Sequence, residues 1–131
     1  MESKKPTVAL VDDDPIYQFT ASKTLQLTKS VAQIHSFLKA EDALNYLSSH
    51  ANDAEMLPDI IFLDINMPIK DGWGFLDDFD KVCSTLAKKA TVYMVSSSID
   101  PRDVQRARQN QHIREYITKP ITVDKFNELL G

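Results

Sequence analysis

Five short apolar runs, each rich in β-branched or aromatic residues, alternate along this chain with segments of helical pattern. Runs of this length and composition are typical of buried β-strands. They cover Val8–Val11, Val31–Phe37, Ile60–Leu63, Val92–Val95 and Ile113–Ile117. The strict alternation of strands and helices predicts an α/β fold, in which helices cover both faces of a parallel sheet and the crossovers are right-handed.

A helical segment follows each of these strands. The segments lie at about Pro15–Lys29, within Ala40–Leu47, at Phe75–Leu86, at about Pro101–Asn110 and at Val123–Leu130. The third has the most regular apolar stripe. The first is irregular, and its expected apolar positions are Ile16, Phe19 and Leu27. The fourth has only Val104 and Ala107 as apolar anchors, so it is expected to pack least firmly.

The polarity of the strands indicates their order in the sheet. The first, third and fourth runs are almost continuously apolar, as strands covered on both faces should be. The second run contains Gln33, His35 and Ser36. The fifth run contains Arg114 and Glu115. These two strands are therefore expected at the edges, and a five-stranded, doubly wound, flavodoxin-like sheet of order 2-1-3-4-5 places them there.

Acidic residues follow two strands that this order makes neighbours. The first strand leads into Asp12, Asp13 and Asp14, and the third leads into Asp64. In open α/β sheets, ligands bind at the carboxyl ends of the strands, where the strand order changes direction. These carboxylates are therefore expected to meet in one crevice. Asp14, which precedes Pro15, is expected mainly to cap the first helix.

Such a cluster of carboxylates needs protonation or a cation. Two like charges ~4 Å apart repel by about 1 kcal/mol in water, and by about 4 kcal/mol at an effective dielectric constant of 20. Oxygen ligands without a nearby His or Cys favour Mg²⁺, Mn²⁺ or Ca²⁺ over Zn²⁺. The small number of protein ligands favours Mg²⁺ over Ca²⁺, because Mg²⁺ keeps several waters and completes its shell with phosphate oxygens.

Two further strand ends carry groups that can contact a phosphate. The fourth strand ends at Ser96, whose hydroxyl can donate to a phosphoryl oxygen, whereas Ser97 and Ser98 are expected to be loop residues. The fifth strand ends at Lys119. Its ammonium group is expected to face the acid cluster, where it can pair with Asp64 and with an attached phosphate.

Four stretches of the sequence resemble the signature motifs of response-regulator receiver domains of two-component signalling, such as chemotaxis regulators. They are Leu10–Pro15, Phe62–Pro68 continuing to Gly72, Tyr93–Ser97 and Tyr116–Pro120. The similarity spans essentially the whole chain, with the motifs in the family's order and spacing. Two details depart from the pattern. Ile69 and Lys70 stand where the family often has a glycine, and Trp73 is expected to be an aromatic anchor at a helix start.

The resemblance implies a role for each matching residue of the metal site. Asp64 matches the phosphoacceptor, which is also a metal ligand, and Asp13 matches the other direct metal ligand. Asp12 matches the acid that holds the metal through water. Asn66 matches the position whose backbone carbonyl completes the site. The implied cofactor is Mg²⁺.

The resemblance also assigns the residues around the phosphoryl group. Ser96 matches the hydroxyl residue that contacts this group, and Lys119 matches the lysine that pairs with it. Tyr116 matches the aromatic switch residue, which turns inward when that hydroxyl moves. The peptide bond between Lys119 and Pro120 is expected to be cis, on the resemblance alone.

The function implied is that of a regulatory phosphoacceptor, not of an enzyme with a separate substrate. It would take its phosphoryl group from a histidine kinase or a histidine phosphotransfer protein and promote its own phosphorylation and dephosphorylation. A downstream protein is expected on the face of the fourth helix, fifth strand and fifth helix. Arg102, Arg106, Arg108 and Arg114 there form either a partner surface or a solvated face. Homodimerisation on phosphorylation stays open.

Composition narrows the remaining choices. A net charge of −4 argues against direct nucleic-acid binding. No apolar run approaches the ~18 residues of a membrane span, and the N-terminus lacks the apolar stretch of a signal peptide. The single cysteine, Cys83, excludes an intrachain disulfide and suits the cytoplasm. The length fits one receiver domain over residues 1–131, with a tail at 1–6.

Some chemistry-bearing residues are expected to be structural. Cys83 falls on the apolar stripe of the third helix and is expected to serve packing. The three histidines, His35, His50 and His112, show no metal-ligand spacing, so they are expected to be surface or strand residues.

Two other functions fit part of the pattern. A pseudo-receiver would keep the fold as a binding module and signal without phosphate, which the full set of matching site residues disfavours. An aspartyl-phosphate hydrolase also places its nucleophile after a strand, but after the first one, and it requires a second Asp where this chain has Asn66. A sequence that starts at Met1 and ends after one domain favours a stand-alone receiver over a segment of a longer regulator.

Overall fold

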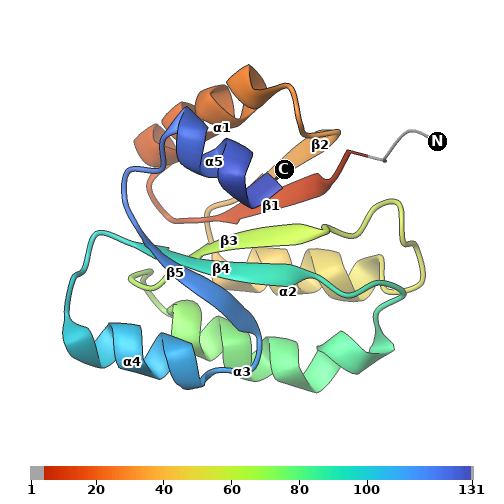
Figure 1. Ribbon diagram of the computed structural model, residues 1–131. Helices are drawn as coiled ribbons and strands as arrows, with labels where there is room; N and C mark the ends of the chain where they lie inside the picture. The colour runs from red at the N-terminus through yellow and green to blue at the C-terminus, as the bar shows by residue number, and fades with distance from the viewer. Residues whose placement is uncertain (1–4, 131) are drawn as a thin grey trace.

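The computed structural model describes residues 5–130 and contains a five-stranded parallel sheet in the order β2-β1-β3-β4-β5 (Figure 1). The strands are β1 (Thr7–Val11), β2 (Gln33–Phe37), β3 (Ile60–Asp64), β4 (Thr91–Ser96) and β5 (Ile113–Thr118). The helices are α1 (Pro15–Thr28), α2 (Ala40–Ser49), α3 (Gly72–Val82), α4 (Pro101–Gln109) and α5 (Val123–Leu130), and a 3₁₀ turn, η1 (Cys83–Thr85), follows α3. The predicted flavodoxin-like order, with β2 and β5 at the edges, is confirmed. The tail expected over residues 1–6 lies outside the described residues except for its last two.

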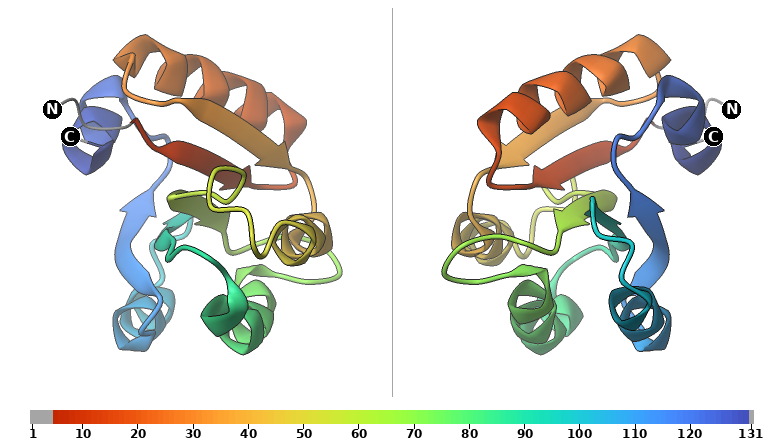
Figure 2. Two further views of the ribbon diagram at one scale, coloured as in Figure 1. Left: turned by 90° about the vertical axis from the view of Figure 1, so that its right-hand side faces the viewer. Right: turned by 90° about the vertical axis from the view of Figure 1, so that its left-hand side faces the viewer.

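Helices cover both faces of the sheet, as Figure 2 shows in views turned by 90° from Figure 1. Helices α1 and α5 lie on one face, and α2, α3 and α4 lie on the other. Alternate residues of β3 point to the two faces, because successive side chains of a strand point in opposite directions. Ile61 and Leu63 pack with α2 and α3, whereas Phe62 packs with α1 and α5 through Phe126.

The strand register brings the functional strand ends into line. Val11 of β1 lies opposite Leu63 of β3, so Asp12 and Asp64 are the next residues along two hydrogen-bonded neighbours. Ser96, at the end of β4, lies opposite Thr118 of β5. The crevice predicted at this edge of the sheet is therefore lined by residues that follow or end β1, β3, β4 and β5.

Aspartates cap three of the helices at this same edge. The carboxylate of Asp14 accepts the main-chain N–H groups of Ile16 and Tyr17, which confirms the capping role predicted for it. Asp100 caps α4 by accepting the N–H of Arg102, and Asp71 caps α3. Caps of this kind satisfy helix donors that have no partner within the helix.

Two sequence predictions about helices were wrong. Helix α3 begins at Gly72 and ends at Val82, and the chain then tightens into η1, so the helix expected to continue to Leu86 is shorter at its end. On α1, the expected apolar stripe is not the buried face. Ile16, Phe19 and Leu27 are 78%, 66% and 68% exposed. The helix buries Gln18, Ala21 and Leu25 instead.

Helix α4 has the thin packing that its sequence predicts, since Ala107 is its buried residue.

Within residues 5–130, no helix combines the length and apolarity needed to cross a membrane.

Candidate functional site

Three carboxylates from two strand ends form the centre of the crevice. One oxygen from each of Asp12, Asp13 and Asp64 lies within 4.8 Å of the others. Asp12 and Asp64 are almost fully buried, with 3% and 5% of their surface exposed. The backbone N–H of Asp14 donates to Oδ1 of Asp12 and fixes that side chain. The grouping expected from the sequence is therefore present in the structure.

Lys119 reaches into this cluster from the end of β5. Its Nζ donates to Oδ2 of Asp12 at 2.6 Å and lies 3.5 Å from Oδ1 of Asp64. The ring of Tyr17 lies 4.2 Å from the same ammonium, in a cation–π contact. Burial alone would lower the pKa of Lys119, but the bonds and charges of Asp12 and Asp64 outweigh burial and raise it. The lysine is therefore held in its charged form.

The charge of Lys119 does not neutralise the whole cluster. Burial, followed by the negative charge of Asp12, raises the pKa of Asp64 from 3.8 to about 6, although Lys119 acts in the opposite direction. Burial and the nearby charges of Asp12 and Asp64 also raise the pKa of Tyr17. A site with excess negative charge and only oxygen donors fits a hard divalent cation such as Mg²⁺.

Gln18 organises the strand ends behind the acids, and sequence analysis missed it. Its side-chain amide donates to the main-chain carbonyls of Leu10, Asp12 and Phe37, each at 3.0 Å. The residue is 6% exposed. The carbonyl of Phe37 also accepts the N–H of Asp12 at 3.0 Å, and Gln18 adds a side-chain donor to the buried carbonyls at the ends of β1 and β2. The only sequence signal was the interrupted apolar stripe of the first helix.

Gly72 allows α3 to begin directly against the strand that carries Asp64. A Cβ atom at Gly72 would lie 2.5 Å from the main-chain oxygen of Asp64. The N–H of Gly72 donates to the carbonyl of Ile65 at 2.8 Å and closes the loop between β3 and α3. This close approach explains why the loop ends in a glycine, and it fixes the peptide that follows Asp64.

The remaining residues predicted for the site lie at or near the ends of β3, β4 and β5. Ser96 is fully buried, and its Oγ accepts the N–H of Ser98 at 3.0 Å. The hydroxyl of Tyr116 donates to the carbonyl of Ser98 at 2.8 Å, so both side chains contact the loop after β4. Asn66 follows β3 in the loop to α3 and has an exposed side chain. The peptide bond between Lys119 and Pro120 is cis, as the resemblance implied.

Trp73 and two of the three exposed arginines of α4 make specific contacts. Trp73 is buried at the start of α3, as predicted for an aromatic anchor, and the guanidinium of Arg106 lies 4.4 Å above its ring. Arg102 forms an ion pair with Asp100, at 2.8 Å. Arg108 and Arg114 are exposed.

Comparison with known proteins identifies the same architecture elsewhere. Residues 8–130 match the profile of the response regulator receiver domain. The crystal structure of a two-component response regulator from Cytophaga hutchinsonii is 35% identical in sequence, with a TM-score of 0.87, covering 96% of this chain and 95% of that one. A response regulator receiver protein from Dyadobacter fermentans is 27% identical, with a TM-score of 0.82, covering 95% of this chain and 94% of that one.

A curated relative extends beyond this chain. The probable C4-dicarboxylate response regulator DctR of Bacillus subtilis is 26% identical over 130 residues, which cover 99% of this chain and 53% of DctR. The chain therefore spans about half the length of that relative.

Proposed function

This chain belongs to the response regulator receiver family of two-component signalling, and on that basis we propose that it accepts a phosphoryl group on Asp64 from a phosphohistidine of a partner protein. The observation that carries the proposal is the grouping of Asp12, Asp13 and Asp64 around the ammonium of Lys119 at the carboxyl ends of the strands. Receiver domains are in general the partners of histidine kinases.

Asp64 is the proposed nucleophile. A carboxylate oxygen of Asp64 forms a bond to phosphorus while the bond between phosphorus and the imidazole nitrogen of the donor breaks. The product is an acyl phosphate on Asp64, and water later hydrolyses it. In this proposal, the carboxylates of Asp13 and Asp64 and the main-chain carbonyl of Asn66 would hold Mg²⁺ directly, and Asp12 would hold it through water. The cation, when bound, neutralises charge on the transferring oxygens.

Lys119 and Ser96 are the proposed contacts of the phosphoryl group. Lys119 already lies 3.5 Å from Oδ1 of Asp64, which suits it to pair with a phosphoryl oxygen on that side chain. Ser96 ends the neighbouring strand, and its hydroxyl can turn from the loop toward the new oxygens. Positioned charges and donors of this kind supply most of the catalysis of phosphoryl transfer.

The loop after β4 is the proposed switch. Ser96 and Tyr116 both bond to Ser98 in this loop, one to its N–H and one to its carbonyl. Movement of the Ser96 hydroxyl toward a phosphoryl group would break the first bond and shift the loop and α4, and Tyr116 would move with it. Phosphate shifts this equilibrium only by stabilising one state more than the other.

The surface of α4, β5 and α5 is the proposed binding face for a downstream protein. Helix α4 has one buried residue, Ala107, so it can move without disrupting much of the core. Arg108 and Arg114 remain exposed on this face.

The test is phosphorylation by a small-molecule phosphodonor in the presence of Mg²⁺, followed by intact-mass and peptide mass spectrometry. Wild-type protein is expected to gain one phosphoryl group on the peptide that contains Asp64, and the modification should be lost on treatment with hydroxylamine, which cleaves acyl phosphates. Asp64→Asn should abolish the gain. Asp77→Asn, which alters an exposed acid on α3, is the matched control and should retain it.

A chelator of Mg²⁺ should also abolish the gain in the wild type. Equal phosphorylation of the wild type and Asp64→Asn would place the phosphate elsewhere and refute the proposal. A folded wild type that takes no phosphate from the donor or from histidine kinases would favour a pseudo-receiver.

A further inference from the structure

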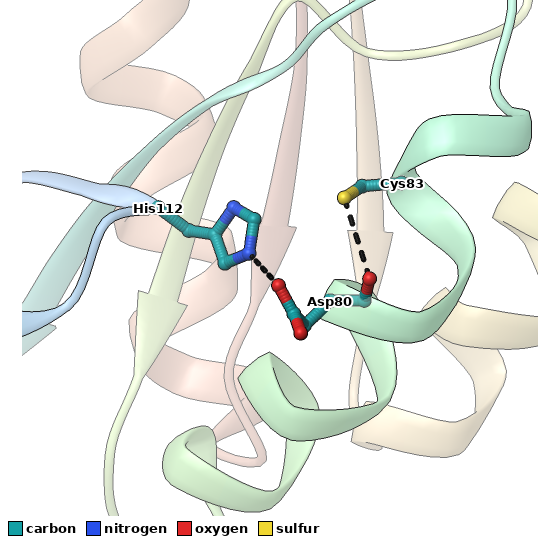
Figure 3. A group of neighbouring side chains, drawn as sticks. All are labelled: Asp80, Cys83 and His112. Carbon is teal, nitrogen blue, oxygen red and sulfur yellow. Dashed lines mark hydrogen bonds and ion pairs between the residues drawn. The ribbon is translucent and has the colours of Figure 1, made fainter.

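A second cluster of metal-ligating side chains lies at the end of α3, whereas the acidic cleft adjoins the start of that helix. Figure 3 shows the three side chains of the cluster. One donor atom from each of Asp80, Cys83 and His112 lies within 4.8 Å of the others. Asp80 and Cys83 come from the end of α3 and the start of η1, and His112 directly precedes β5. Nothing local in the sequence links position 112 to positions 80 and 83, which is why His112 and Cys83 were expected to be structural residues.

We propose that Asp80, Cys83 and His112 form a binding site for Zn²⁺ or a similar first-row transition-metal ion. This site is independent of the cleft around Asp64 and of the function proposed for it. The inference rests on the donor set, on the distances between the donors and on the open space beside them.

The three donors are of the types that Zn²⁺ selects. A thiolate, an imidazole nitrogen and a carboxylate oxygen form a mixed set that suits a borderline-soft ion, whereas Mg²⁺ prefers oxygen alone. On binding, the thiol of Cys83 releases its proton to solvent and becomes a thiolate. Cys83 and Asp80 then contribute two negative charges, which balance the charge of the ion.

The donors are close enough to converge on one ion. Nε2 of His112 lies 2.7 Å from Oδ1 of Asp80, and Sγ of Cys83 lies 3.6 Å from the main-chain oxygen of Asp80. Tetrahedral Zn²⁺ with bonds of 2.0–2.3 Å separates its donors by roughly 3.5 Å. The carboxylate and the imidazole must therefore move apart by roughly 1 Å, which rotation of the exposed Asp80 side chain can supply.

Surrounding contacts orient His112 before any ion binds. The rings of Phe79 and His112 make an edge-to-face contact, with centroids 5.2 Å apart and ring planes at 83°. The backbone N–H of His112 donates to Oδ1 of Asn110, which fixes the turn before β5. The side-chain amide of Gln111 donates to Oδ1 of Asp80 and holds that carboxylate beside the ring. Orientation of ligands by such outer contacts is typical of metal sites.

Two grooves border the cluster and leave space for a fourth ligand. A groove of about 620 Å³ is bordered by Asp80, Cys83 and His112, and a second groove of about 740 Å³ is bordered by Asp80 and His112. The side chain of Asp80 is 56% exposed. A water molecule or an external ligand can therefore complete the coordination shell.

Positive charges nearby limit the affinity but do not fill the site. Lys88, Lys89 and Arg114 border the first groove. Lys88 is engaged by Asp59, at 3.1 Å. An ion held here would tie the end of α3 to the start of β5, two segments that the sequence separates by about 30 residues.

Titration of the reduced protein with Co²⁺ provides a selective test, because Co²⁺ replaces Zn²⁺ and is coloured. Saturating Mg²⁺ in every sample keeps the acidic cleft occupied. Cys83 is the only cysteine of the chain, so a thiolate-to-cobalt absorption band can arise only from this position. The wild type is expected to develop this band with one equivalent of Co²⁺ and to lose it when Zn²⁺ is added.

Substitutions then test each ligand. Cys83→Ser should abolish the band. His112→Gln and Asp80→Asn should each weaken Co²⁺ binding by at least ~10-fold, because loss of a residue that only orients a metal ligand already weakens metal binding by that much. His50→Ala is the matched histidine control and should bind normally. Asp64→Asn should also bind normally, which separates this site from the proposed phosphoacceptor.

Absence of the band in the folded wild type would overturn the proposal. So would a band that His112→Gln and Asp80→Asn leave unchanged, since Cys83 would then bind without its partners. If a variant fails to fold, the rate at which iodoacetamide alkylates Cys83 in the wild type decides instead. Zn²⁺ should slow this reaction at least ~10-fold, in line with the loss of a free thiolate, and an unchanged rate refutes the site.

Discussion

Lys119 bonds more closely to Asp12 than to Asp64, the residue that we propose is phosphorylated. Its Nζ is 2.6 Å from Oδ2 of Asp12 and 3.5 Å from Oδ1 of Asp64. Asp12 and Asp64 are both nearly buried, so the lysine is their main source of positive charge among the described side chains. In the unphosphorylated site, the ammonium of Lys119 is thus bound mainly to Asp12, the neighbour of the proposed acceptor Asp64.

Lys119→Met should therefore destabilise the protein without Mg²⁺. Removal of one partner of a buried ion pair typically costs about 3–5 kcal/mol, because the other charge is left uncompensated. Urea unfolding should show a loss of this order, and Mg²⁺ should restore more stability to the variant than to the wild type. The matched control is Lys125→Met, which removes surface pairs with Glu115 and Glu128 and should change stability by less than about 1 kcal/mol. A similar loss in both variants would contradict this account.

Asp64→Asn should stabilise the Mg²⁺-free protein at neutral pH. Folding raises the pKa of Asp64 from 3.8 to about 6, so its protonated form favours the folded state below pH 3.8, and this contribution is lost as the pH rises through about 6. The rise corresponds to at most about 3 kcal/mol. The variant should thus exceed the wild type in unfolding free energy by up to this amount above pH ~7 and by little near pH ~4. Saturating Mg²⁺ should reduce this difference in unfolding free energy. A difference that does not change with pH would contradict the raised pKa of Asp64.

Gly72→Ala should disturb the site, whereas Gly74→Ala should not. The added methyl group at position 72 would lie 2.5 Å from the backbone oxygen of Asp64, which cannot move aside without shifting the strand end. At position 74 the nearest atom is Cγ of the flexible Lys70 side chain, at 3.0 Å. Overpacking of this kind costs about 1–3 kcal/mol. Thermal unfolding and phosphorylation rates of the two variants give the comparison, and equal effects would refute the specific role of Gly72.

Gln18→Leu should be among the more harmful substitutions in α1. The change leaves the carbonyls of Leu10 and Asp12 without the Gln18 donor, at a cost of about 1–3 kcal/mol for each carbonyl that stays buried. Gln26→Leu, at an exposed position of the same helix, is the control and should be nearly neutral. Denaturant unfolding measures both, and a neutral Gln18→Leu would show that water replaces the amide.

Arg106→Ala should alter the fluorescence of Trp73, the only tryptophan of the chain, because the guanidinium lies 4.4 Å from its ring. Loss of the cation–π contact should cost about 0.5–1 kcal/mol, and α4 should become easier to displace from α3. Emission spectra and unfolding curves test this, with the exposed Arg108→Ala as the control. Identical spectra for the wild type and Arg106→Ala would exclude the contact in solution.

The sheet and the acidic cleft could be predicted from sequence because both depend on local patterns. Apolar runs define the strands, and the residue after each strand lies at the same edge of a parallel sheet. The close bond between Lys119 and Asp12 was not predicted, since sequence position indicates which edge a side chain occupies but not which of two neighbouring acids it contacts.

Helix α1 shows where pattern reading fails. Ile16, Phe19 and Leu27 are apolar but exposed, while the polar Gln18 is buried. The helix lies over the ends of β1 and β2, and the side-chain amide of Gln18 can be buried there because it donates to their carbonyls. The cluster of Asp80, Cys83 and His112 was missed for a different reason, since only the folded chain brings position 112 to the end of α3.

The contact between Gly72 and the backbone oxygen of Asp64 also has a mechanical consequence. Helix α3 starts at this contact and runs for 11 residues, or about 16 Å, to the turn that carries Cys83. With no room for even a methyl group between strand and helix, the first residue of α3 touches the peptide that follows Asp64 directly. The chain therefore has no slack at this junction, and the backbone position of Asp64 is set by where α3 begins.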